Sequence, residues 1–369
     1  MERTDDLLPG LLADIEELVR CESPSVDPEA LARSTEVVAA LGERRLGERP
    51  ERVESGGRVH LRWRFGTGPR RVLVLGHHDT VWPIGTLLTH PYAISDGVLR
   101  GPGCVDMKAG LVLAMHAIAG LPSRAGLTLL VTCDEELGSP TSRALVESEA
   151  AGCAAALVLE AAGPGGALKT ERKGVSRYRV RVHGRAAHAG LEPERGVNAT
   201  VELAHQVLAL AALADPGRGT TVTPTLLTAG TSENTVSATG EVAVDVRVRD
   251  LAEQQRVDEA VRTLRPLLPD ARLEVLGGPN RPPLEPSASA ALFARAVALS
   301  ERLGLPEPTA AAVGGGSDGN FTAGIGTPAL DGLGAVGGGA HADDEHVLVA
   351  ALPQRVRLVA ALIEETLRA

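Results

Sequence analysis

The chain contains very few aromatic residues. Phe, Trp and Tyr together make up 2% of its 369 residues, whereas hydrophobic residues as a whole make up 44%. A core built from this sequence must therefore consist mainly of Ala, Val and Leu. A chain of this length and apolar content can bury a substantial core. Its length favours two domains, or one domain with a large insertion.

Features that mark several other classes of protein are absent. No block of Lys or Arg stands out and the net charge is −10, so we expect no nucleic-acid partner. No apolar run approaches the length of a membrane span, and the first ten residues lack the pattern of a secretion signal. The cysteines, Cys21, Cys104, Cys133 and Cys153, show no CxxC spacing. Isolated cysteines favour reduced thiols and a cytoplasmic location.

Strand and helix patterns alternate along most of the chain. Apolar runs at 72–75, 126–132 and 154–160 predict strands, and the segments 108–120 and 141–150 between them predict helices. Uniformly apolar strands that alternate with helices predict an α/β fold. We expect a mixed, mostly parallel sheet that is covered by helices on both faces.

The pattern changes over residues 173–280, where apolar and polar residues alternate as in a strand with one solvated face. A helix is predicted over 251–268 near the end of this stretch. The Gly/Pro-rich segment 277–286 predicts a loop that returns the chain to its first domain. We therefore expect a small α+β unit inserted into one larger domain, which comprises residues 1–172 and 281–369.

Seven acidic and histidine residues lie at the ends of predicted strands or in Gly-rich loops. They are His77, Asp79, Asp106, Glu135, Glu136, Glu160 and His341. In an open α/β sheet, binding sites form at the carboxyl ends of the strands. Imidazole and carboxylate groups that meet at such an edge can bind metal ions. The set predicts a metal site, although each residue alone is more typical of a turn or a solvated helix start.

Spacing separates the roles of some of these residues. His77 and Asp79 point to the same side of an extended chain, which suits Asp79 to orient the His77 ring, whereas His78 faces away. The neighbours Glu135 and Glu136 diverge at a turn, so one can bind metal while the other takes a proton. Two divalent cations among three carboxylates and two neutral imidazoles keep a positive charge, which lowers the pKa of a bridging water.

Five motifs follow one another in an order and at separations that resemble those of a known family. They are "GHHDTV", "GPGCVDMKAG", "DEELG", "LVLE" and "GAHADDEHV", and the similarity runs from about residue 5 to the end. The chain resembles the dinuclear zinc peptidases, which include glutamate carboxypeptidase, aminoacylase, carnosinase and succinyl-diaminopimelate desuccinylase. It is most similar to the glutamate carboxypeptidase branch, through segments such as "HDTVWP", "GVNA" and "GGGSD".

The resemblance implies two Zn²⁺ ions per subunit, and Co²⁺ or Mn²⁺ can occupy similar sites. The implied ligands are His77, Asp106, Glu136, Glu160 and His341. His77 and Glu160 would bind one ion. Glu136 and His341 would bind the other, and Asp106 would bridge the two.

The resemblance also implies roles for neighbouring groups. Asp79 would orient the histidine ligand, and Glu135 would act as the general base for a hydroxide that bridges the ions. A cis peptide bond is implied between Asp106 and Met107. The implied fold is of the zinc-exopeptidase type, in which residues 173–280 form a lid and dimerisation domain.

Five further residues match positions at which the family binds its substrate. His188 would reach the active site of the partner subunit in a homodimer and help to stabilise the oxyanion. Asn234 and Arg247 would hold the substrate. Arg281 and Gly315, the latter in the "GGGSD" loop, would grip a free α-carboxylate. Taken without the resemblance, His188, Arg247 and Arg281 are each more typical of a solvated surface.

The predicted activity is hydrolysis of the amide bond next to a C-terminal amino acid, in a small peptide or N-acyl amino acid. An N-acyl-amino-acid deacylase or desuccinylase is the first alternative, because the metal site does not distinguish the two. A non-catalytic binding protein on the same scaffold is a second alternative, against which the intact Glu135 argues. A third is a nucleotide-binding protein that uses Gly101–Gly110, although this loop lacks the GxxxxGK[ST] order.

Overall fold

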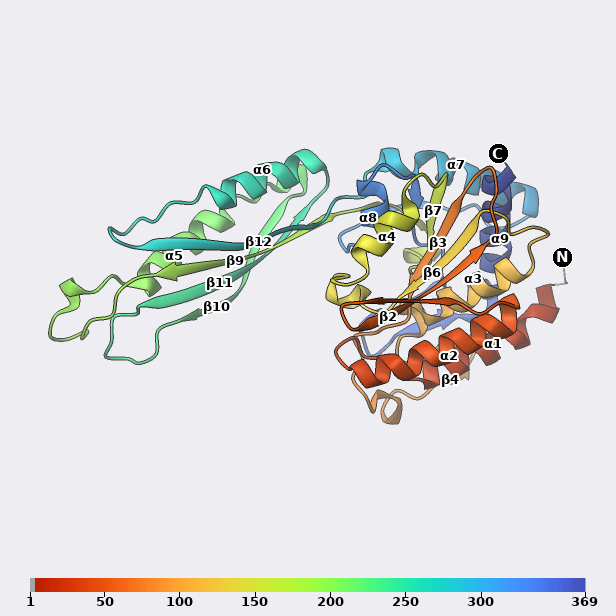
Figure 1. Ribbon diagram of the computed structural model, residues 1–369, viewed down its shortest axis with the longest axis horizontal. Helices are drawn as coiled ribbons and strands as arrows, with labels where there is room; N and C mark the ends of the chain where they lie inside the picture. The colour runs from red at the N-terminus through yellow and green to blue at the C-terminus, as the bar shows by residue number, and fades with distance from the viewer. Residues whose placement is uncertain (1–3, 369) are drawn as a thin grey trace. The chain divides into compact units, whose positions relative to one another are not determined.

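The computed structural model describes residues 4–368 of the chain and divides it into two compact units (Figure 1). The first unit extends to Glu171 and includes Glu285–Val313 and the chain from Ser317 onward; the second comprises Arg172–Leu284 and Gly314–Gly316. Residues 1–3 belong to the N-terminal stretch in which no secretion signal is expected, and they lie outside the described residues.

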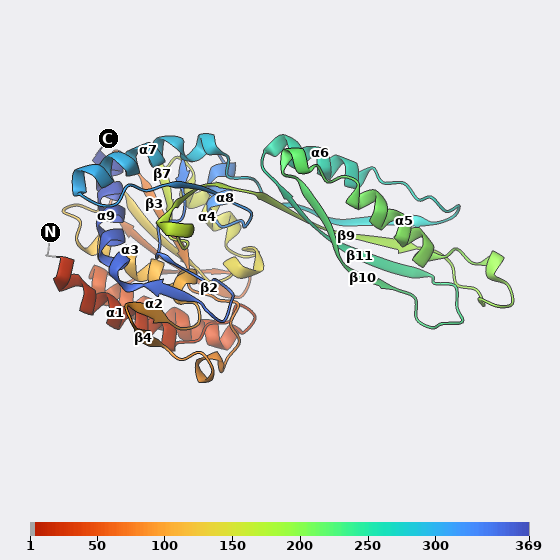
Figure 2. The same ribbon diagram turned by 180° about the vertical axis from the view of Figure 1, so that it is seen from behind.

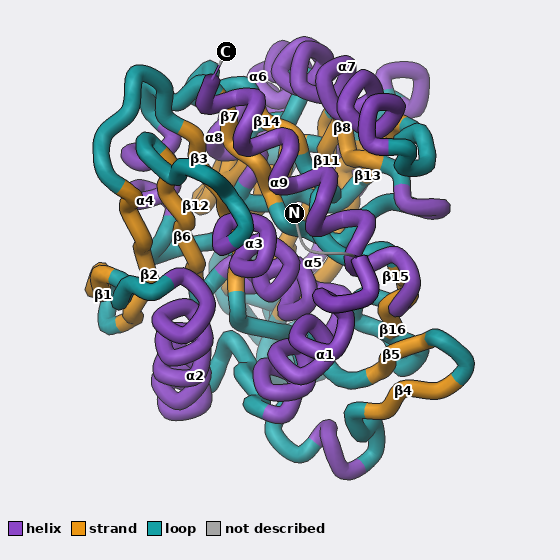
Figure 3. Tube along the Cα trace, turned by 90° about the vertical axis from the view of Figure 1, so that its right-hand side faces the viewer, coloured by secondary structure: helices purple, strands orange, loops and turns teal. Residues whose placement is uncertain are grey.

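A six-stranded sheet of order β1-β2-β6-β3-β7-β14 forms the centre of the first unit (Figure 3). Its strands are β1 (Glu51–Ser55), β2 (Arg58–Phe65), β3 (Val72–His77), β6 (Leu127–Thr132), β7 (Ala155–Val158) and β14 (Ala329–Leu330). β3 is parallel to both of its neighbours and β14 is parallel to β7, whereas β2 is antiparallel to both of its neighbours, β1 and β6. The prediction of a mixed, mostly parallel sheet is confirmed.

Helices cover both faces of this sheet, as Figures 1 and 3 show. One face carries α1 (Thr4–Arg20), α2 (Pro28–Leu46), α3 (Ala109–Ala119) and α9 (Leu352–Arg368), which pack against one another. The other carries α4 (Arg143–Ala150) and α8 (Gly319–Gly324), and α7 (Pro286–Leu303) packs against β14 and α9. Because both faces are covered, every residue of β3 is buried, which explains its uniformly apolar run.

The remaining strands of the first unit form two small sheets. One has the order β15-β16-β5-β4, and the other pairs β13 with β8. Their bounds are β4 (Ala93–Ser95), β5 (Val98–Arg100), β8 (Leu168–Arg172), β13 (Ala310–Val313), β15 (Gly337–Gly338) and β16 (His346–Leu348). None of the helices formed by residues 4–368 is both long and apolar enough to cross a membrane. The four cysteines form no disulfide.

The second unit is a four-stranded antiparallel sheet of order β10-β11-β9-β12 with two helices (Figure 2). Its elements are β9 (Gly174–His183), α5 (Ala199–Ala211), β10 (Thr221–Ala229), β11 (Thr239–Val248), α6 (Leu251–Arg262) and β12 (Arg272–Arg281). Both helices pack on the same sheet, where alternate residues of β9 and β11 are buried. The alternating pattern therefore arises from one covered face.

The helix predicted over 251–268 is shorter than expected, because α6 ends at Arg262. Pro266 explains the early end. A proline lacks the backbone N–H that a helix interior needs, and it disfavours helical geometry in the residue before it.

The prediction of a loop over 277–286 is wrong for residues 277–281, because β12 continues to Arg281 and pairs with β9. β12 lies at the edge of the sheet, where a proline such as Pro279 is tolerated. Gly277 has a φ of 84°, and a Cβ there would lie 2.2 Å from the carbonyl oxygen of Arg177. Glycine is therefore required for the strand to pass this point.

Candidate metal centre

Three neighbouring parallel strands carry polar side chains to one edge of the central sheet. His77 is the last residue of β3, Glu135 and Glu136 begin the turn η3 (Glu135–Leu137) after β6, and Glu160 follows β7. β3 lies between β6 and β7, and the carboxyl ends of parallel strands meet at the same edge. This topology brings the four residues into one place.

Two further residues reach this edge from loops. Asp106 lies in the segment η2 (Cys104–Lys108) that precedes α3, where its own backbone is not helical, and His341 lies between β15 and β16. The Asp106–Met107 peptide bond is cis, and His341 has a positive φ of 64°.

The five predicted ligands converge, with Asp106 between two imidazoles. Nε2 of His77 lies 3.5 Å from Oδ1 of Asp106 and 3.6 Å from Oε1 of Glu160. Nε2 of His341 lies 3.3 Å from Oδ2 of Asp106 and 3.1 Å from Oε1 of Glu136. Ligand atoms that each lie 2.0–2.2 Å from a tetrahedral zinc ion stand about 3.3–3.6 Å apart. The spacing therefore fits two metal positions that share Asp106.

Two buried polar atoms at this place have no hydrogen-bond partner among residues 4–368. They are Nε2 of His77 and Oδ1 of Asp106, which face each other. A buried polar group without a partner is costly, and few such groups occur in native structures. A metal ion between these atoms would satisfy both of them. The residues present therefore fit a metal centre.

The side chains of the cluster shift one another's pKa. Burial disfavours the charged form of His77, but the nearby carboxylates, Asp106 most strongly, raise its pKa well above the ordinary value. Asp106 and Glu136 raise the pKa of His341 to about 10. Burial would raise the pKa of Asp106, but His341 and His77 hold it well below the usual range. Without metal, protons on the imidazoles balance these carboxylates.

Asp79 links His77 to Glu135 and Glu136. Its backbone carbonyl accepts a hydrogen bond from Nδ1 of His77 at 3.0 Å, which leaves Nε2 of the ring to face Asp106. Its fully buried carboxylate accepts from Ser25 Oγ at 2.7 Å and from the backbone amides of Glu135 and Glu136 at 3.3 and 3.2 Å. Burial opposes the ionisation of Asp79, but His77 and Ser25 lower its pKa to about 2.

His78 lies outside the cluster, in the core. Its Nδ1 lies 2.9 Å from Ser34 Oγ and its Nε2 lies 3.4 Å from Thr35 Oγ1. Burial lowers its pKa to about 3, so the ring is neutral at pH 7.

The carboxylate of Glu135 lies near the proposed metal ligands, although the predicted role of Glu135 is that of a base that binds no metal. Its carboxylate, a ring nitrogen of His77 and an oxygen of Glu160 all lie within 4.8 Å of one another. The side chain is half-buried. A carboxylate in this position can bind a metal ion or accept a proton from an attacking water.

Glu345 organises the loop that carries Asp106. Its carboxylate, 4% exposed, accepts hydrogen bonds from the backbone amides of Gly103, Val105 and Asp106 at 2.9, 2.8 and 3.1 Å. It also accepts from the indole N–H of Trp82 at 2.7 Å. The sequence carries no signal for this role, because Glu345 belongs to the acidic run "ADDEH", which is typical of a solvated loop.

In the second unit, His188 and Asn234 lie on neighbouring exposed segments. Nδ1 of His188 accepts hydrogen bonds from the backbone amides of Gly190 and Leu191, both at 3.1 Å. Nδ1 is therefore the unprotonated nitrogen of the neutral ring, and Nε2 carries the proton. The backbone carbonyl of Asn234 accepts from the amide of Ala189 at 2.9 Å.

Arg281 is the last residue of β12 and is 4% exposed. Its carbonyl accepts a hydrogen bond from the side chain of Gln254 at 2.8 Å. The alternative view of Arg281 as a solvated residue in a proline-rich turn is therefore wrong, because the edge strand extends to include it.

Two arginines of the second unit donate to the Gly-rich segment Gly314–Gly316. Arg172 Nη1 lies 3.1 Å from the carbonyl oxygen of Gly315, and Arg247 Nη1 lies 3.5 Å from that of Gly314. Arg247 also forms a bidentate pair with Asp245 at 2.8 and 3.0 Å. Arg172 is buried, and nothing in the charged run "KTERKG" indicates that position.

Comparison with known sequences agrees with the motif pattern. The model of "Peptidase family M20/M25/M40" matches residues 73–365. Carboxypeptidase G2 of Pseudomonas sp. (strain RS-16) is 30% identical over 375 residues, which cover 97% of this chain and 89% of that protein. The alignment with a succinyl-diaminopimelate desuccinylase of Methylorubrum populi has 30% identity over a length of 393 residues. It covers 94% of this chain and 96% of that protein.

Solved structures show the same fold. The M20 family metallo-carboxypeptidase Sso-CP2 of Sulfolobus solfataricus has a TM-score of 0.76 at 15% identity, over 100% of both chains. A dinuclear metal-binding peptidase of the M20 family from Bacillus subtilis has a TM-score of 0.68 at 16% identity, over 99% of both chains. With its motifs, its fold and its converging ligands, the chain belongs to the peptidase family M20/M25/M40 and is a metal-dependent hydrolase.

Proposed function

We propose that the protein is a dinuclear zinc carboxypeptidase that hydrolyses the amide bond next to a C-terminal amino acid with a free carboxylate. The observation that carries this proposal is the position of Asp106 between His77 and His341, with Glu136 and Glu160 beside them. The similarity to carboxypeptidase G2 along nearly the whole chain supports the peptidase assignment.

His77, Asp106 and Glu160 would hold one metal ion, and His341, Asp106 and Glu136 the other. When bound, two divalent ions supply Lewis-acid polarisation of the scissile carbonyl and lower the pKa of an attacking water. Mn²⁺ and Co²⁺ suit the same donors, so the choice of metal depends on availability as well as on the site.

The chain's own residues move the proton. Glu135 would take a proton from the attacking water and deliver it to the leaving nitrogen. Asp79 would keep both Glu135 and His77 in place, since it accepts hydrogen bonds from the amide of the former and the ring of the latter. Its own pKa of about 2 makes it a poor proton acceptor at neutral pH.

The second unit would supply the groups that recognise the substrate. His188 has a proton on Nε2 to donate to the oxyanion of the tetrahedral intermediate, in the active site of the partner subunit. Arg281 and the loop at Gly315 would bind the α-carboxylate, which a guanidinium can grip with two hydrogen bonds. Asn234 and Arg247 would hold the rest of the substrate.

A homodimer formed through the second unit is part of the proposal. β10 is an edge strand, and it exposes Leu226 and Leu227 at 68% and 54%. Leu208 of α5 is 70% exposed. Large apolar side chains that stay exposed on an edge strand and a neighbouring helix are typical of a surface that another chain covers.

A desuccinylase is the second candidate, because the desuccinylase of Methylorubrum populi matches 94% of this chain at the same identity. It would use the same metal ligands on an N-succinyl amino acid. A side-by-side substrate panel separates the two candidates. The carboxypeptidase proposal expects turnover of N-acyl-glutamate and peptidyl-glutamate to exceed that of N-succinyl-diaminopimelate by about tenfold or more.

The panel uses purified protein that has been stripped of metal and reloaded with two equivalents of Zn²⁺. A preference for N-succinyl-diaminopimelate would replace the first candidate by the second. Absence of turnover on every N-acyl and peptidyl amino acid, with both metal ions bound, would favour the binding-protein alternative.

A further inference from the structure

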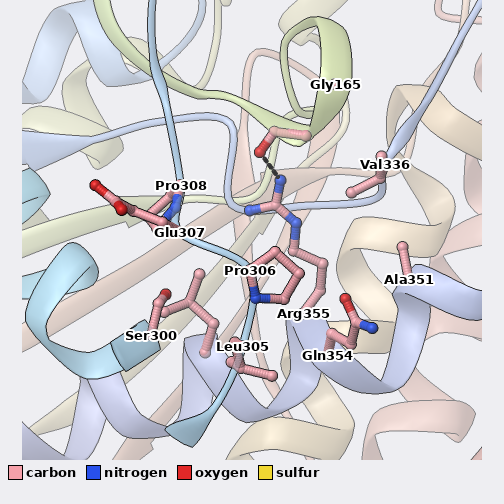
Figure 4. A pocket seen from close by; sticks show the side chains of 12 residues that line it. Gly165, Ser300, Leu305, Pro306, Glu307, Pro308, Val336, Ala351, Gln354 and Arg355 are labelled. Atoms are coloured by element: carbon pink, nitrogen blue, oxygen red, sulfur yellow. Dashed lines mark hydrogen bonds between the residues drawn. The ribbon is translucent and has the colours of Figure 1, made fainter. Parts of the chain in front are cut away.

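A cavity in the first unit lies apart from the metal ligands, none of which lines it (Figure 4). Its walls come from the turn η4 (Pro164–Gly166), the segment 305–308 and the start of α9. The cavity has a volume of about 170 Å³. One water needs roughly 10–15 Å³ by the same kind of measure, so this space can take a ligand of several heavy atoms.

Arg355 brings a buried positive charge to this cavity. The residue is 6% exposed, and its guanidinium donates to the backbone carbonyl of Gly166 (Figure 4). Among the described residues, no carboxylate forms an ion pair with Arg355. Burial lowers its pKa to about 10, so the group stays charged at pH 7. Since buried charges are normally paired, this guanidinium lacks the counter-charge that its burial calls for.

A second polar group of the cavity lacks a partner. The side chain of Ser300 on α7 is fully buried, and its hydroxyl makes no hydrogen bond with any residue that the structure describes. Glu307 is the one acidic residue of the lining, and Figure 4 shows that its carboxylate extends away from the guanidinium of Arg355. The hydroxyl and the guanidinium are both donors, so they suit an acceptor that carries negative charge.

The rest of the lining is mainly apolar. It includes Leu305, Pro306, Pro308, Val336 and Leu358. Small-molecule sites combine such apolar walls with a few polar groups that fix orientation. An inorganic anion would leave these walls without a partner, whereas an acid with a hydrocarbon chain would cover them.

We propose that this cavity binds a small aliphatic carboxylic acid. The guanidinium of Arg355 and the hydroxyl of Ser300 hold the carboxylate, and the hydrocarbon chain lies against the Leu and Pro residues of the wall. This site is separate from the catalytic centre and does not depend on the identity of the substrate.

Binding of sodium valerate to the metal-loaded protein, measured by isothermal titration calorimetry, tests the proposal. Arg355→Met removes the charge and keeps an apolar chain of similar length, and Ser300→Ala removes only the hydroxyl. Arg357→Met is the matched control, because Arg357 lies on the same helix and also donates to a backbone carbonyl, that of Leu303 at 2.7 Å, without lining the cavity.

We expect wild-type protein and Arg357→Met to bind valerate with the same affinity. Arg355→Met should bind it about tenfold more weakly or worse, and Ser300→Ala about threefold to tenfold more weakly, as expected for a charged and a neutral hydrogen bond. n-Pentylammonium chloride, which has a similar chain and the opposite charge, should not bind.

Three results would overturn the proposal. Titration of valerate into the wild-type protein could show no saturable binding. Valerate could bind Arg355→Met as tightly as Arg357→Met, which would place it at the metal centre. Inorganic phosphate could bind as tightly as valerate, which would leave no role for the apolar wall. If Arg355→Met does not fold, a Ser300→Ala protein with undiminished valerate affinity would equally contradict the site.

Discussion

The carboxylate of Glu345 accepts a hydrogen bond from the backbone amide of Asp106, a residue 239 positions earlier in the chain, at 3.1 Å. The same carboxylate accepts from two more amides of that loop, so one buried side chain fixes the backbone that presents the proposed bridging ligand. Glu345 is therefore a positioning residue for the metal centre.

Glu345→Gln should weaken metal binding. A glutamine side chain has an N–H₂ group in place of one carboxylate oxygen. This group cannot accept hydrogen bonds from the backbone amides, so the loop loses part of its hydrogen bonding. Loss of such outer support typically lowers metal affinity about 10–100-fold. Zn²⁺ affinity of the metal-free protein, measured by competition with a chelator, provides the check. Asp344→Asn, an exposed neighbour, is the control, and equal affinity in the two variants would contradict the role.

Glu135→Gln should retain both metal ions and lose about 10²–10⁴-fold in turnover, as expected when a general base is removed. Metal content by elemental analysis and kcat on the best substrate of the panel are measured together. Full activity would assign the base to another residue. Loss of one metal ion would instead make Glu135 a ligand, which its distance to His77 and Glu160 permits.

Metal binding at pH 8 should release protons. The carboxylates raise the pKa of His341 to about 10, so its ring is protonated in the metal-free protein, whereas a metal ligand must be neutral. Metal affinity should therefore fall as the pH decreases below this value. Calorimetry of Zn²⁺ binding in buffers of different ionisation enthalpy counts the protons, and a heat independent of the buffer would contradict the expectation.

The same raised pKa has a consequence for the stability of the metal-free protein. When folding raises the pKa of a group, protonation of that group stabilises the fold. The stabilisation is fully present at pH values below the pKa of the unfolded state, which for His is about 6.5. This contribution of His341 should decrease as the pH rises through about 10. Urea unfolding of the metal-free protein at several pH values, compared with His341→Gln, measures it. A difference between the two proteins that does not shrink with rising pH would refute this linkage.

Asp14 should be required for stability although it lies away from the active site. Its buried carboxylate accepts from Arg45 at 2.6 Å and lies 2.7 Å from Nε2 of His116, so its removal leaves the buried ring of His116 and the partly buried guanidinium of Arg45 without this partner. We expect Asp14→Ala to lower the free energy of unfolding by about 3–5 kcal/mol. Glu17→Gln, which breaks an exposed pair with Arg44, should change it by about 1 kcal/mol or less. Urea unfolding compares them, and equal effects would argue against a special role for burial.

His188→Ala should bind metal normally but turn over its substrate slowly. If His188 acts in the partner's active site, a mixture of His188→Ala and Glu135→Gln subunits should regain activity. In the mixed dimer, one site combines an intact Glu135 with an intact His188. The kcat of the mixture after subunit exchange is the measurement, and the unmixed variants are its controls. Activity equal to the mean of the separate variants would exclude action in trans.

Local sequence determined the strands at the centre of the sheet and the order of the proposed metal ligands. Val72–Leu75 predicts a strand covered on both faces because the run is wholly apolar, and β3 is buried throughout. His77 ends that strand, so the strand itself fixes where the imidazole lies. The N-cap of α2 is likewise local, since the Asp27 side chain accepts from the amides of Glu29 and Ala30.

Only the tertiary structure determined which charged residues are buried. Arg172, Arg355 and Glu345 lie in segments that look solvated, and each is buried through contacts with residues that are distant in the sequence. The extension of β12 to Arg281 depends on its position at the sheet edge, which local composition does not encode. Periodicity reports whether a segment has one covered face, but burial of a single charge depends on a distant partner that no local pattern contains.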